Sequence, residues 1–448
     1  MACHIPYVAR LRRTPCPSAL LTPVWVQQLF RGLREVGSYH TPLDLVRRRS
    51  PERPVALVRP DALAVAARWF QDNFKGDVLY AVKANPSPWA IKALARNGVT
   101  GFDVASIPEI ELVAEKAPGA RMAFMHPVKS RAAIAAAYFD YGVRTFALDT
   151  LEELEKICEA TDGAKDLNLF VRLAVETHGA AYSLAGKFGA DAREAAPLLL
   201  GARRATDELM GVSFHVGSQC MRPSAFQAAM AQVSRALVRA GVFADVIDVG
   251  GGFPSIYPGL VPPDLSEYVA AIDRGFAEMM VGETAELWCE PGRALVAEGS
   301  SLLTRVELRK GDALYLNDGS YGAMFDAAHT RWPFPARLHR GDGDASPTLK
   351  PFRFFGPTCD SLDVMPGPFW LPEDVREGDY VEIGMLGAYG VAMASRFNGF
   401  GDVETCEVED PPMLSMFGLA PRTLATPKAE TADVVKLSRA RGKRRRRR

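Results

Sequence analysis

The chain has 448 residues, of which 48% are hydrophobic and 24% are charged, and its formal net charge is +0. This length is enough for a large core and two domains, and a neutral chain has no overall attraction for nucleic acids or other polyanions. No run of about eighteen apolar residues occurs, so we expect no transmembrane helix. The seven cysteines are odd in number and include no CxxC, which argues against a disulfide framework and favours a reducing, cytoplasmic compartment.

The first 53 residues form a basic extension, with five arginines and no acidic residue before Glu35. Such segments are usually solvated. We expect residues 1–53 to be a loose extension, part of which joins the β-domain described below. A transit-type peptide and an upstream start codon are the alternatives.

A repeated unit begins near residue 60, in which helical stretches such as SPWAIKALARNG (87–98) and TLEELEKICEA (150–160) alternate with short apolar strands. These strands are apolar on both faces, as in parallel sheets that helices cover on each side. We predict eight of them, at 79–85, 100–106, 121–127, 144–149, 169–175, 211–218, 246–252 and 287–293. Eight βα units predict a (β/α)8 barrel, which we assign to residues 54–294.

Polar residues, and in one case a glycine, lie near the C-terminal end of each predicted strand: Lys83, Asp103, His126, Asp149, Arg172, His215, Gly250 and Glu290. In (β/α)8 barrels this face carries the active site. A single polar residue there can simply solvate the rim. Eight in succession favour a functional face, although not every one needs a function.

After about residue 295 the helical pattern gives way to short strands and turns. Turn signals at KGD (310–312), NDG (317–319) and EGD (377–379) predict an all-β domain. The expected fold class is therefore α/β plus β, with a C-terminal β-domain at 295–420 and a surface loop at about 338–350. Residues 421–448 end in RGKRRRRR and are predicted to be a disordered basic tail. Binding of RNA, anionic lipid or an acidic partner by this tail is the less favoured alternative.

Lys83 lies near the end of the apolar run VLYAVKANP (78–86). Burial disfavours the charged form of a lysine and lowers its pKa, which suits an amine that attacks a carbonyl and forms a Schiff base. A lysine at a strand end can also extend its ammonium into solvent. The segment by itself leaves these two interpretations equal.

Four further motifs carry candidate chemistry, each with a plain structural alternative. GGGFP (250–254) can receive a phosphate on its backbone amides or form a tight turn. HVGSQ (215–219) offers an imidazole and a hydroxyl, although a lone histidine is usually a core residue. EPGR (290–293) can form an ion pair or meet two parts of one ligand. In GPTCDS (356–361), Cys359 is either a buried hydrophobe or a partly exposed thiol. No two histidines have metal-ligand spacing, so no metal is expected.

Together these pieces resemble the fold-type III pyridoxal-phosphate decarboxylases, the family of the ornithine, lysine and diaminopimelate decarboxylases. The resemblance extends from about Val55 to about Gly401. It rests on YAVKAN (80–85), FDVAS (102–106), KFG (187–189), HVGSQ, GGGFP, EPGR, CDS (359–361) and GAYG (387–390), in this order and spacing. It implies an alanine-racemase-like (β/α)8 barrel that binds pyridoxal 5'-phosphate, followed by a β-domain.

The resemblance also implies roles for individual residues. Lys83 would form the Schiff base with the cofactor, Glu290 would pair with the pyridine nitrogen, and His215 would stack on the ring. The other cofactor-binding positions would be Asp103, Arg172, Ser218, Gly251, Gly252, Gly292, Arg293 and Tyr389. Cys359 would complete the catalytic set by protonating the substrate carbon after carbon dioxide leaves. It would belong to the partner subunit's site, so a homodimer with shared active sites is the expected catalytic unit.

The far end of the substrate is expected to meet Asp326 and Asp360, beside Cys359. Asp360 follows Cys359 as in the ornithine and lysine enzymes, whereas diaminopimelate enzymes usually show CES. Two carboxylates suit the ammonium of a diamine precursor. The resemblance therefore implies decarboxylation of L-ornithine to putrescine, with L-lysine to cadaverine as a second activity. Phe325 stands where some relatives carry tyrosine, which leaves one hydrogen bond near the substrate in doubt.

Three other functions stay open at this stage. A diaminopimelate decarboxylase is the first, and a non-catalytic homologue that regulates other decarboxylases is the second. Such homologues tend to lose the lysine, the phosphate-binding residues or the thiol, all of which are present here. An amino-acid racemase shares the barrel but normally uses a tyrosine as its second acid–base group, and the CDS motif and the length argue against it. We expect no membrane partner, and nucleic-acid binding only through the basic tail.

Overall fold

The computed structural model describes residues 35–419 except 177–178, 183–185, 192 and 331. Most of the predicted N-terminal extension and all of the predicted basic tail (421–448) lie outside the described residues. No helix in the described part is long and apolar enough to cross a membrane. The same residues contain no group of three His, Cys, Asp or Glu side chains arranged to hold a metal ion.

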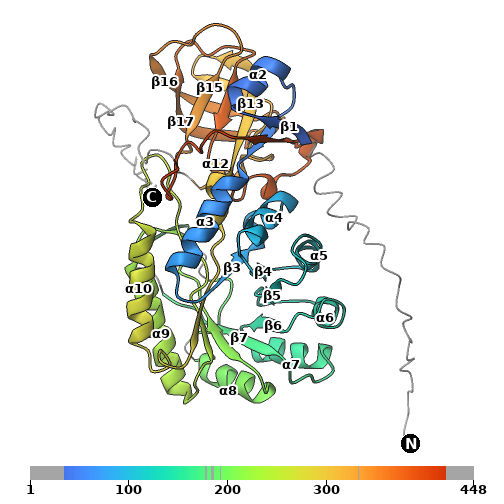
Figure 1. The fold of residues 1–448 in the computed structure, drawn as a ribbon, viewed down its shortest axis with the longest axis vertical. Coiled ribbons are helices and arrows are strands. Elements are labelled where there is room, and N and C mark those ends of the chain that lie inside the picture. The colour runs from blue at the N-terminus through green and yellow to red at the C-terminus, as the bar shows by residue number, and fades with distance from the viewer. Residues whose placement is uncertain (1–34, 177–178, 183–185, 192, 331, 420–448) are drawn as a thin grey trace, which may run out of the picture.

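Eight parallel strands close into a barrel, which occupies the lower part of Figure 1 and confirms the predicted architecture. They are β3 (Asp77–Ala81), β4 (Gly101–Val104), β5 (Arg121–Phe124), β6 (Thr145–Leu148), β7 (Asn168–Arg172), β9 (Met210–Ser213), β11 (Val246–Asp248) and β12 (Glu286–Cys289). Each strand is shorter than its predicted run. Lys83 therefore lies in the turn η1 (Val82–Ala84) after β3, and Glu290 directly follows β12. Most of the polar residues near the predicted strand ends lie in the loops at the C-terminal rim.

Helices cover the outside of the barrel (Figure 1). They are α3 (Pro60–Asn73), α4 (Pro88–Arg96), α5 (Ile107–Lys116), α6 (Arg131–Ala135) with η2 (Ala136–Asp140), α7 (Leu151–Ala160), α8 (Ala195–Ala205), α9 (Ser224–Ala240) and α10 (Leu265–Ala277). The stretches predicted to be helical at 87–98 and 150–160 form α4 and α7. Thr150 caps α7, because its hydroxyl accepts a hydrogen bond from the backbone N–H of Glu153 at 3.1 Å.

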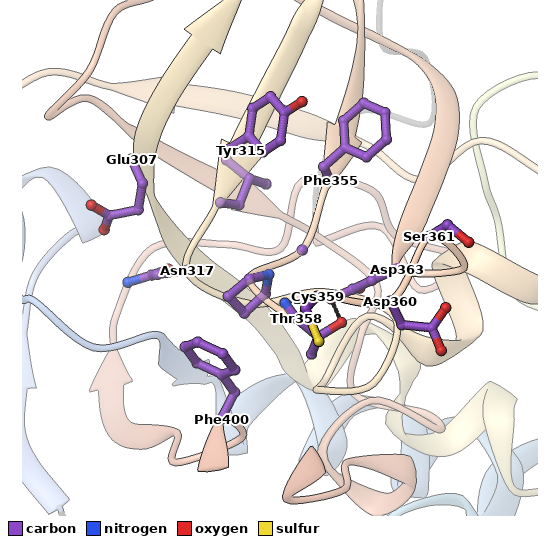
Figure 2. A pocket seen from close by; sticks show the side chains of 13 residues that line it. Glu307, Tyr315, Asn317, Phe355, Thr358, Cys359, Asp360, Ser361, Asp363 and Phe400 are labelled. Atoms are coloured by element: carbon purple, nitrogen blue, oxygen red, sulfur yellow. Dashed lines mark hydrogen bonds between the residues drawn. The ribbon is translucent and has the colours of Figure 1, made fainter. Parts of the chain in front are cut away.

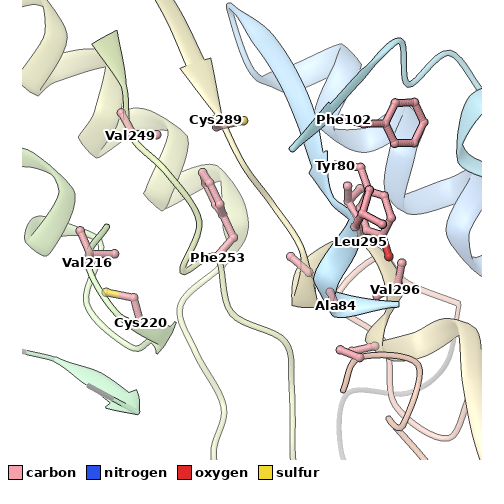
Figure 3. Close-up of a cluster of buried hydrophobic side chains, with 14 of the residues drawn as sticks. Tyr80, Ala84, Phe102, Val216, Cys220, Val249, Phe253, Cys289, Leu295 and Val296 are labelled. Carbon is pink, nitrogen blue, oxygen red and sulfur yellow. The ribbon is translucent and has the colours of Figure 1, made fainter. Parts of the chain in front are cut away.

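Apolar side chains fill the barrel and support the rim. Trp288 on β12 stacks on Phe170 of β7, with 4.8 Å between ring centroids. A larger apolar cluster continues between the strands and the helices, and Figure 3 shows part of it around Phe102, Phe253 and Cys289. The barrel interior is thus a packed core and not a pore.

A nine-stranded sheet forms the upper part of Figure 1 and confirms the predicted β-domain. Its strands are β1 (Glu35–Tyr39), β2 (Val55–Val58), β13 (Ser300–Lys310), β14 (Ala313–Leu316), β15 (Ala336–His339), β16 (Leu349–Phe355), β17 (Val364–Pro372), β18 (Tyr380–Ile383) and β19 (Glu404–Val408). The shorter elements are α2 (Pro42–Arg49), β8 (Ala180–Tyr182), β10 (Ser218–Cys220), α11 (Arg293–Val296), η3 (Ala297–Gly299), α12 (Phe325–His329), η4 (Val391–Met393) and η5 (Phe397–Gly399). The predicted KGD turn joins β13 to β14 as an antiparallel hairpin.

Two strands of this sheet precede the barrel in sequence. β2 lies inside the range 54–294 that the sequence assigned to the barrel, but it pairs with β13 and β19 in the sheet. β1 pairs with β19 as well. The run 55–58 is buried on both faces, like a barrel strand, and such a pattern does not reveal the strands with which it pairs.

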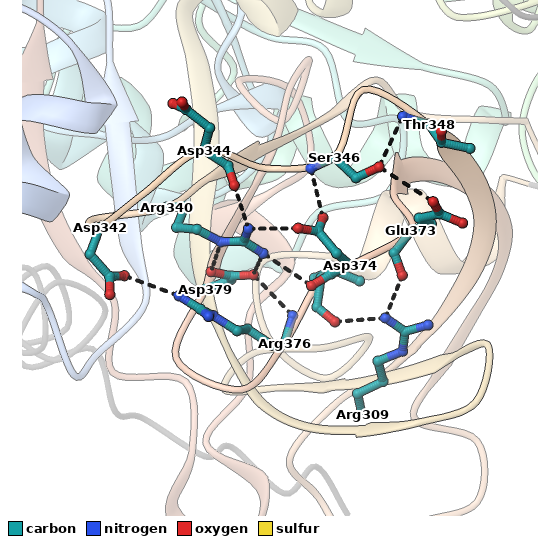
Figure 4. Close-up of polar contacts among 11 residues, drawn as sticks. Arg309, Arg340, Asp342, Asp344, Ser346, Thr348, Glu373, Asp374, Arg376 and Asp379 are labelled. Carbon is teal, nitrogen blue, oxygen red and sulfur yellow. Dashed lines mark hydrogen bonds and ion pairs between the residues drawn. The ribbon is translucent and has the colours of Figure 1, made fainter.

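Ion pairs hold the loops at one edge of the sheet (Figure 4). Arg340 follows β15 and donates hydrogen bonds to Asp379 at 2.7 Å and to Asp374 at 2.8 Å. Arg309 donates to the carbonyl of Glu373. The predicted surface loop is therefore tied to the sheet, and its first two residues belong to β15.

A buried ionic cluster joins the end of β2 to β18. The carboxylate of Glu382 is fully buried and accepts hydrogen bonds from Arg59 Nη2 at 3.0 Å, Ser301 Oγ at 2.6 Å and His339 Nε2 at 2.8 Å. Burial alone would raise the pKa of Glu382. The hydrogen bond from His339 and the charge of Arg59 outweigh burial and lower the pKa from 4.5 to about 2.

We expect Glu382→Gln to destabilise the fold by about 3 kcal/mol at pH 7, because it removes a charged partner of a buried arginine. A depressed carboxyl pKa stabilises the fold only while the group is charged. This contribution is therefore complete above pH 4.5 and is lost as the pH falls toward about 2. Denaturant unfolding at pH 7 and pH 3 measures both effects.

The matched control for this substitution is Glu373→Gln, which breaks a surface pair between Glu373 and Lys350 at 2.8 Å. We expect it to cost less than about 1 kcal/mol. A destabilisation by Glu382→Gln that is equal at the two pH values would contradict the assignment of a depressed pKa.

Candidate active site

A cavity of about 460 Å³ lies at the C-terminal rim of the barrel. Its lining contains every residue that the sequence assigned to the cofactor: Lys83, Asp103, Arg172, His215, Ser218, Gly251, Gly252, Glu290, Gly292, Arg293 and Tyr389. These residues come from several strand ends and from the segment that follows β18. The closure of parallel strands brings such distant residues together, because all their C-terminal ends meet at one rim.

Lys83 and Asp103 form an ion pair at the rim of the cavity. Lys83 Nζ lies 2.7 Å from Asp103 Oδ2. Burial alone would lower the pKa of Lys83, but the negative charge of Asp103, which also accepts a hydrogen bond from the amine, outweighs burial and raises it. This direction is opposite to the expectation from the sequence, which considered burial alone. In this structure Lys83 is a charged ammonium that Asp103 holds.

Glu290 and Asp248 form a pair of buried carboxyl groups. Burial, together with the negative charge of Asp248, raises the pKa of Glu290 well above its usual value. Burial raises the pKa of Asp248 to about 6. One proton shared by such a pair is more favourable than two neighbouring charges, so we assign that proton to Glu290. Asp248 was missed from the sequence, although an aspartate inside the apolar strand VIDV was a signal.

The HVGSQ and GGGFP motifs meet at the side chain of His215. Its Nδ1 accepts a hydrogen bond from the backbone N–H of Gly217 at 2.9 Å, so the ring proton is on Nε2. Burial and the positive charge of Arg172 lower the pKa of His215 well below its usual value, so the ring is neutral. A Cβ on Gly251 would lie 3.0 Å from Nε2, and one on Gly252 (φ +101°) would lie 2.5 Å from the carbonyl of Gly217. Only glycines allow this close approach.

Two other predicted strand-end residues hold the KFG segment in place. Asp149 Oδ2 accepts a hydrogen bond from the backbone N–H of Gly189 at 2.9 Å. The ring of His126 packs edge-on against Phe188, with 5.2 Å between centroids. Lys187 and Phe188 also line the cavity. Asp149 therefore supports the cavity wall from outside the cavity.

Asp326 is the buried counterion of Arg293. Arg293 Nη1 donates to Asp326 Oδ2 at 2.6 Å and to the hydroxyl of Tyr257 at 2.7 Å, and Nη2 donates to Asp326 Oδ1 at 3.3 Å. Arg293 Nε has no hydrogen-bond partner among the described residues. The sequence assigned Asp326 to the substrate and Arg293 to the cofactor and did not foresee this contact or Tyr257. The substrate role of Asp326 stays a prediction.

Cys359 and Asp360 line a different cavity, of about 630 Å³, on the β-domain (Figure 2). Within one chain, the structure does not bring the predicted thiol acid to Lys83. The hydroxyl of Tyr321 donates to Asp360 Oδ2 at 2.7 Å. The hydrogen bonds that Asp360 accepts from the backbone N–H of Leu362 and from Tyr321 lower the pKa of Asp360, so it is charged at neutral pH.

A buried carboxylate fixes the loop that carries Cys359. Asp363 Oδ1 accepts from the backbone N–H of Ser320 at 2.7 Å and from its hydroxyl at 3.0 Å. Asp363 Oδ2 accepts from the backbone N–H of Thr358 at 3.0 Å and from its hydroxyl at 2.7 Å. These four bonds link the loop after β16 to the loop after β14. Asp363 was not predicted to have a role.

The residues around Lys83 fit a ligand that carries an anion and a ring nitrogen. The glycine turn at 250–252 and the free Nε of Arg293 provide donors for an anion. Glu290 Oε1 is buried and has no hydrogen-bond partner among the described residues. A buried polar atom normally has a partner, so this atom is suited to bind a ligand nitrogen. Lys83 supplies an amine for a carbonyl.

Comparison with known proteins bears on this site directly. The family model "Pyridoxal-dependent decarboxylase, pyridoxal binding domain" matches residues 62–297. The lysine/ornithine decarboxylase of Selenomonas ruminantium is 36% identical over 346 residues, which cover 75% of this chain and 85% of the relative. Antizyme inhibitor 2 of Xenopus laevis is 33% identical over 348 residues, which cover 72% and 73%.

A solved structure gives the same result for the fold. The Paramecium bursaria Chlorella virus arginine decarboxylase bound to agmatine matches with a TM-score of 0.72 and 26% identity, covering 82% of this chain and 98% of that chain. The resemblance noted from the sequence is thereby confirmed, and so is the cofactor. The chain belongs to the pyridoxal-dependent decarboxylase family, and its cofactor is pyridoxal 5'-phosphate.

Proposed function

We propose that this chain decarboxylates L-ornithine to putrescine and carbon dioxide, and L-lysine to cadaverine as a second activity. The observation that carries this proposal is the charge of the cavity beside Cys359. Glu307, Asp360 and Asp363 line it, and none of its lining residues in the described part is cationic. Asp363 is used by the loop itself, and Glu307 lies 3.5 Å from the guanidinium of Arg305, which leaves Asp360 for an ammonium. Diaminopimelate would also need a cation for its second carboxylate.

We propose further that the catalytic unit is a homodimer. Cys359 and Lys83 line different cavities, so a second chain has to bring the thiol to the lysine. Large apolar side chains are exposed near the thiol loop, including Leu362 (71%), Phe397 (43%) and Phe400 (42%). A second copy that covers these side chains would remove them from water.

The cofactor, when bound, supplies a carbonyl for the substrate amine and a ring that accepts electrons from the breaking bond. Arg293, Ser218 and the backbone of Gly251 and Gly252 would hold its phosphate. Glu290, which carries a proton in this structure, would face the ring nitrogen. The neutral ring of His215 would cover one face of the cofactor without adding a charge.

The chain's own residues manage the protons. Lys83 is a charged ammonium here, so it has to release a proton before its amine can act as a nucleophile. Asp103, at 2.7 Å, holds the ammonium in place until that proton leaves. At the end of the reaction Cys359 would donate its S–H proton to the substrate carbon that has lost carbon dioxide.

The requirement for a reduced thiol supports the proposal of a cytoplasmic location. The five cysteines in the described part of the chain are free. A thiol that donates a proton cannot be part of a disulfide, and reducing compartments keep thiols free.

A non-catalytic role is the second candidate, because antizyme inhibitor 2 is among the relatives. The residues that the reaction needs are present in this chain: the amine of Lys83, the guanidinium of Arg293 and the thiol of Cys359. Their retention favours the enzyme.

A panel of amino acids tests the proposed reaction. Protein loaded with pyridoxal phosphate is expected to release carbon dioxide from L-ornithine faster than from L-lysine, by about 10- to 200-fold, since one methylene is worth only about that factor. Release from meso-diaminopimelate and L-arginine should not exceed background. Borohydride should fix the cofactor on Lys83, as mass spectrometry would show, and should fail in Lys83→Ala. If the protein binds the cofactor but releases carbon dioxide from none of the four amino acids, the non-catalytic role is favoured.

Mixing two inactive variants tests the shared site. Lys83→Ala and Cys359→Ala are each expected to produce little diamine. Random exchange of subunits should restore about a quarter of the native diamine output, because half the dimers are mixed and each mixed dimer has one complete site. Cys359→Ala mixed with Asp360→Asn, assayed at L-ornithine far below the native KM so that Asp360→Asn is nearly inactive, is the control, since both changes lie on one loop and no mixed dimer has a complete site. Restored output in the control, or none in the first mixture, would contradict shared sites.

Neutralising Asp360 and Glu307 one at a time tests which carboxylate binds the substrate ammonium. Asp360→Asn should raise the KM for L-ornithine by about 10- to 100-fold, the usual loss for a hydrogen bond to a charged group. Glu307→Gln, in the same cavity, is the matched control and should change KM by less than about threefold. A larger effect of Glu307→Gln than of Asp360→Asn would move the ammonium site to Glu307.

A further inference from the structure

The side chain of Asn398 holds Cys359 at two points. Asn398 Oδ1 accepts a hydrogen bond from the backbone N–H of Cys359 at 3.1 Å and another from its thiol, with Sγ at 3.2 Å. Two donors converge on one side-chain atom, so this atom is the amide oxygen and not the amide nitrogen. The thiol hydrogen therefore has one defined direction in this structure.

The backbone of Asn398 is in the left-handed region, with φ 55° and ψ 14°. Asparagine tolerates this conformation better than most residues other than glycine, but it is not the preferred one. Asn398 is the middle residue of η5, and its side-chain amide meets the thiol. Residues in such sparsely populated conformations cluster at functional sites.

Tyr321 connects the segment of Asn398 to the loop of Cys359. The backbone N–H and the hydroxyl of Ser395 donate to the carbonyl of Tyr321 at 2.8 and 3.0 Å. The ring of Phe397 lies 4.9 Å from the ring of Tyr321, and the hydroxyl of Tyr321 holds Asp360. The position of Asn398 relative to the thiol is therefore set by contacts on both sides.

We propose that Asn398 is a positioning residue that orients the proton of the Cys359 thiol. This inference rests on the proposed role of Cys359 and adds the group that holds its proton before transfer. An amide oxygen accepts the hydrogen bond of the thiol without competing for its proton, so it directs the S–H bond. A carboxylate at this position would hold the proton more strongly, and a residue without an acceptor would not direct it.

Thiol alkylation tests this proposal without relying on turnover. The cofactor-loaded enzyme is treated with iodoacetamide across a range of pH, and the rate at Cys359 is followed by mass spectrometry, with Cys158 as an internal reference. Asn398→Gly keeps the left-handed backbone and removes the acceptor. It should be alkylated about three- to tenfold faster than the native enzyme, as expected for the loss of one hydrogen bond.

Asn398→Asp should have the opposite effect. A carboxylate next to the sulfur disfavours the thiolate, so alkylation should slow and its half-maximal pH should rise by about one unit. Arg396→Ala is the matched control in the same segment. Arg396 pairs with Asp402 at 3.0 Å, and no contact joins its side chain to Cys359 in the described structure. This variant should keep the native rate.

Equal shifts in the same direction for Asn398→Gly and Asn398→Asp would overturn the proposal, since they would indicate a loosened loop. A change in Arg396→Ala as large as that in Asn398→Gly would overturn it for the same reason. Opposite shifts support it. If Cys359→Ala also keeps full diamine output, the orientation of the thiol by Asn398 stands, and the proposed catalytic role of Cys359 fails.

Discussion

Closure of the eight parallel strands is the constraint on which the site depends. It directs the C-terminal ends of all the strands to one rim and so gathers Lys83, Arg172 and Arg293 around one cavity. Cations this close have to be balanced by acids, because the packed core beneath them offers little solvation. Asp103 and the Glu290–Asp248 pair provide that balance, and Asp326 does so for Arg293. Each cation at the rim thus has acidic neighbours, and the charge of one residue depends on the others.

This matching gives each acid near the cavity a distinct state. Asp103 is paired with an ammonium, whereas burial and the charge of Asp248 raise the pKa of Glu290 and favour its protonated form. Burial, and then the charges of Arg172 and Lys83, lower the pKa of His215, so its imidazole stays neutral. Neighbouring titratable groups of the cavity thus have different charges, which suits each of them to a different role.

Much of the fold could be predicted from the sequence. The strands are apolar on both faces, and this pattern marks parallel strands buried by helices. The rim residues also followed, since each lies near the end of such a strand. The pairing of β2 with the sheet, the contact of Arg293 with Asp326 and the raised pKa of Lys83 did not follow. Each depends on residues that are distant in sequence, and strand periodicity carries no information about such partners. The separation of Cys359 from Lys83 within one chain was expected only from the family resemblance, which assigned the thiol to the partner subunit's site, and not from any local pattern.

The arrangement of β1, β19 and β2 has a consequence for synthesis of the protein. β19 lies between two strands from the start of the chain and pairs with both. A ribosome finishes the whole barrel sequence before residues 404–408 emerge. Until then, β1 and β2 lack the neighbour that separates them in the finished sheet, and their exposed edges can pair with other chains. β19, the last strand of the described residues, therefore completes the sheet, and a nascent chain that stalls within the β-domain exposes strand edges that favour aggregation.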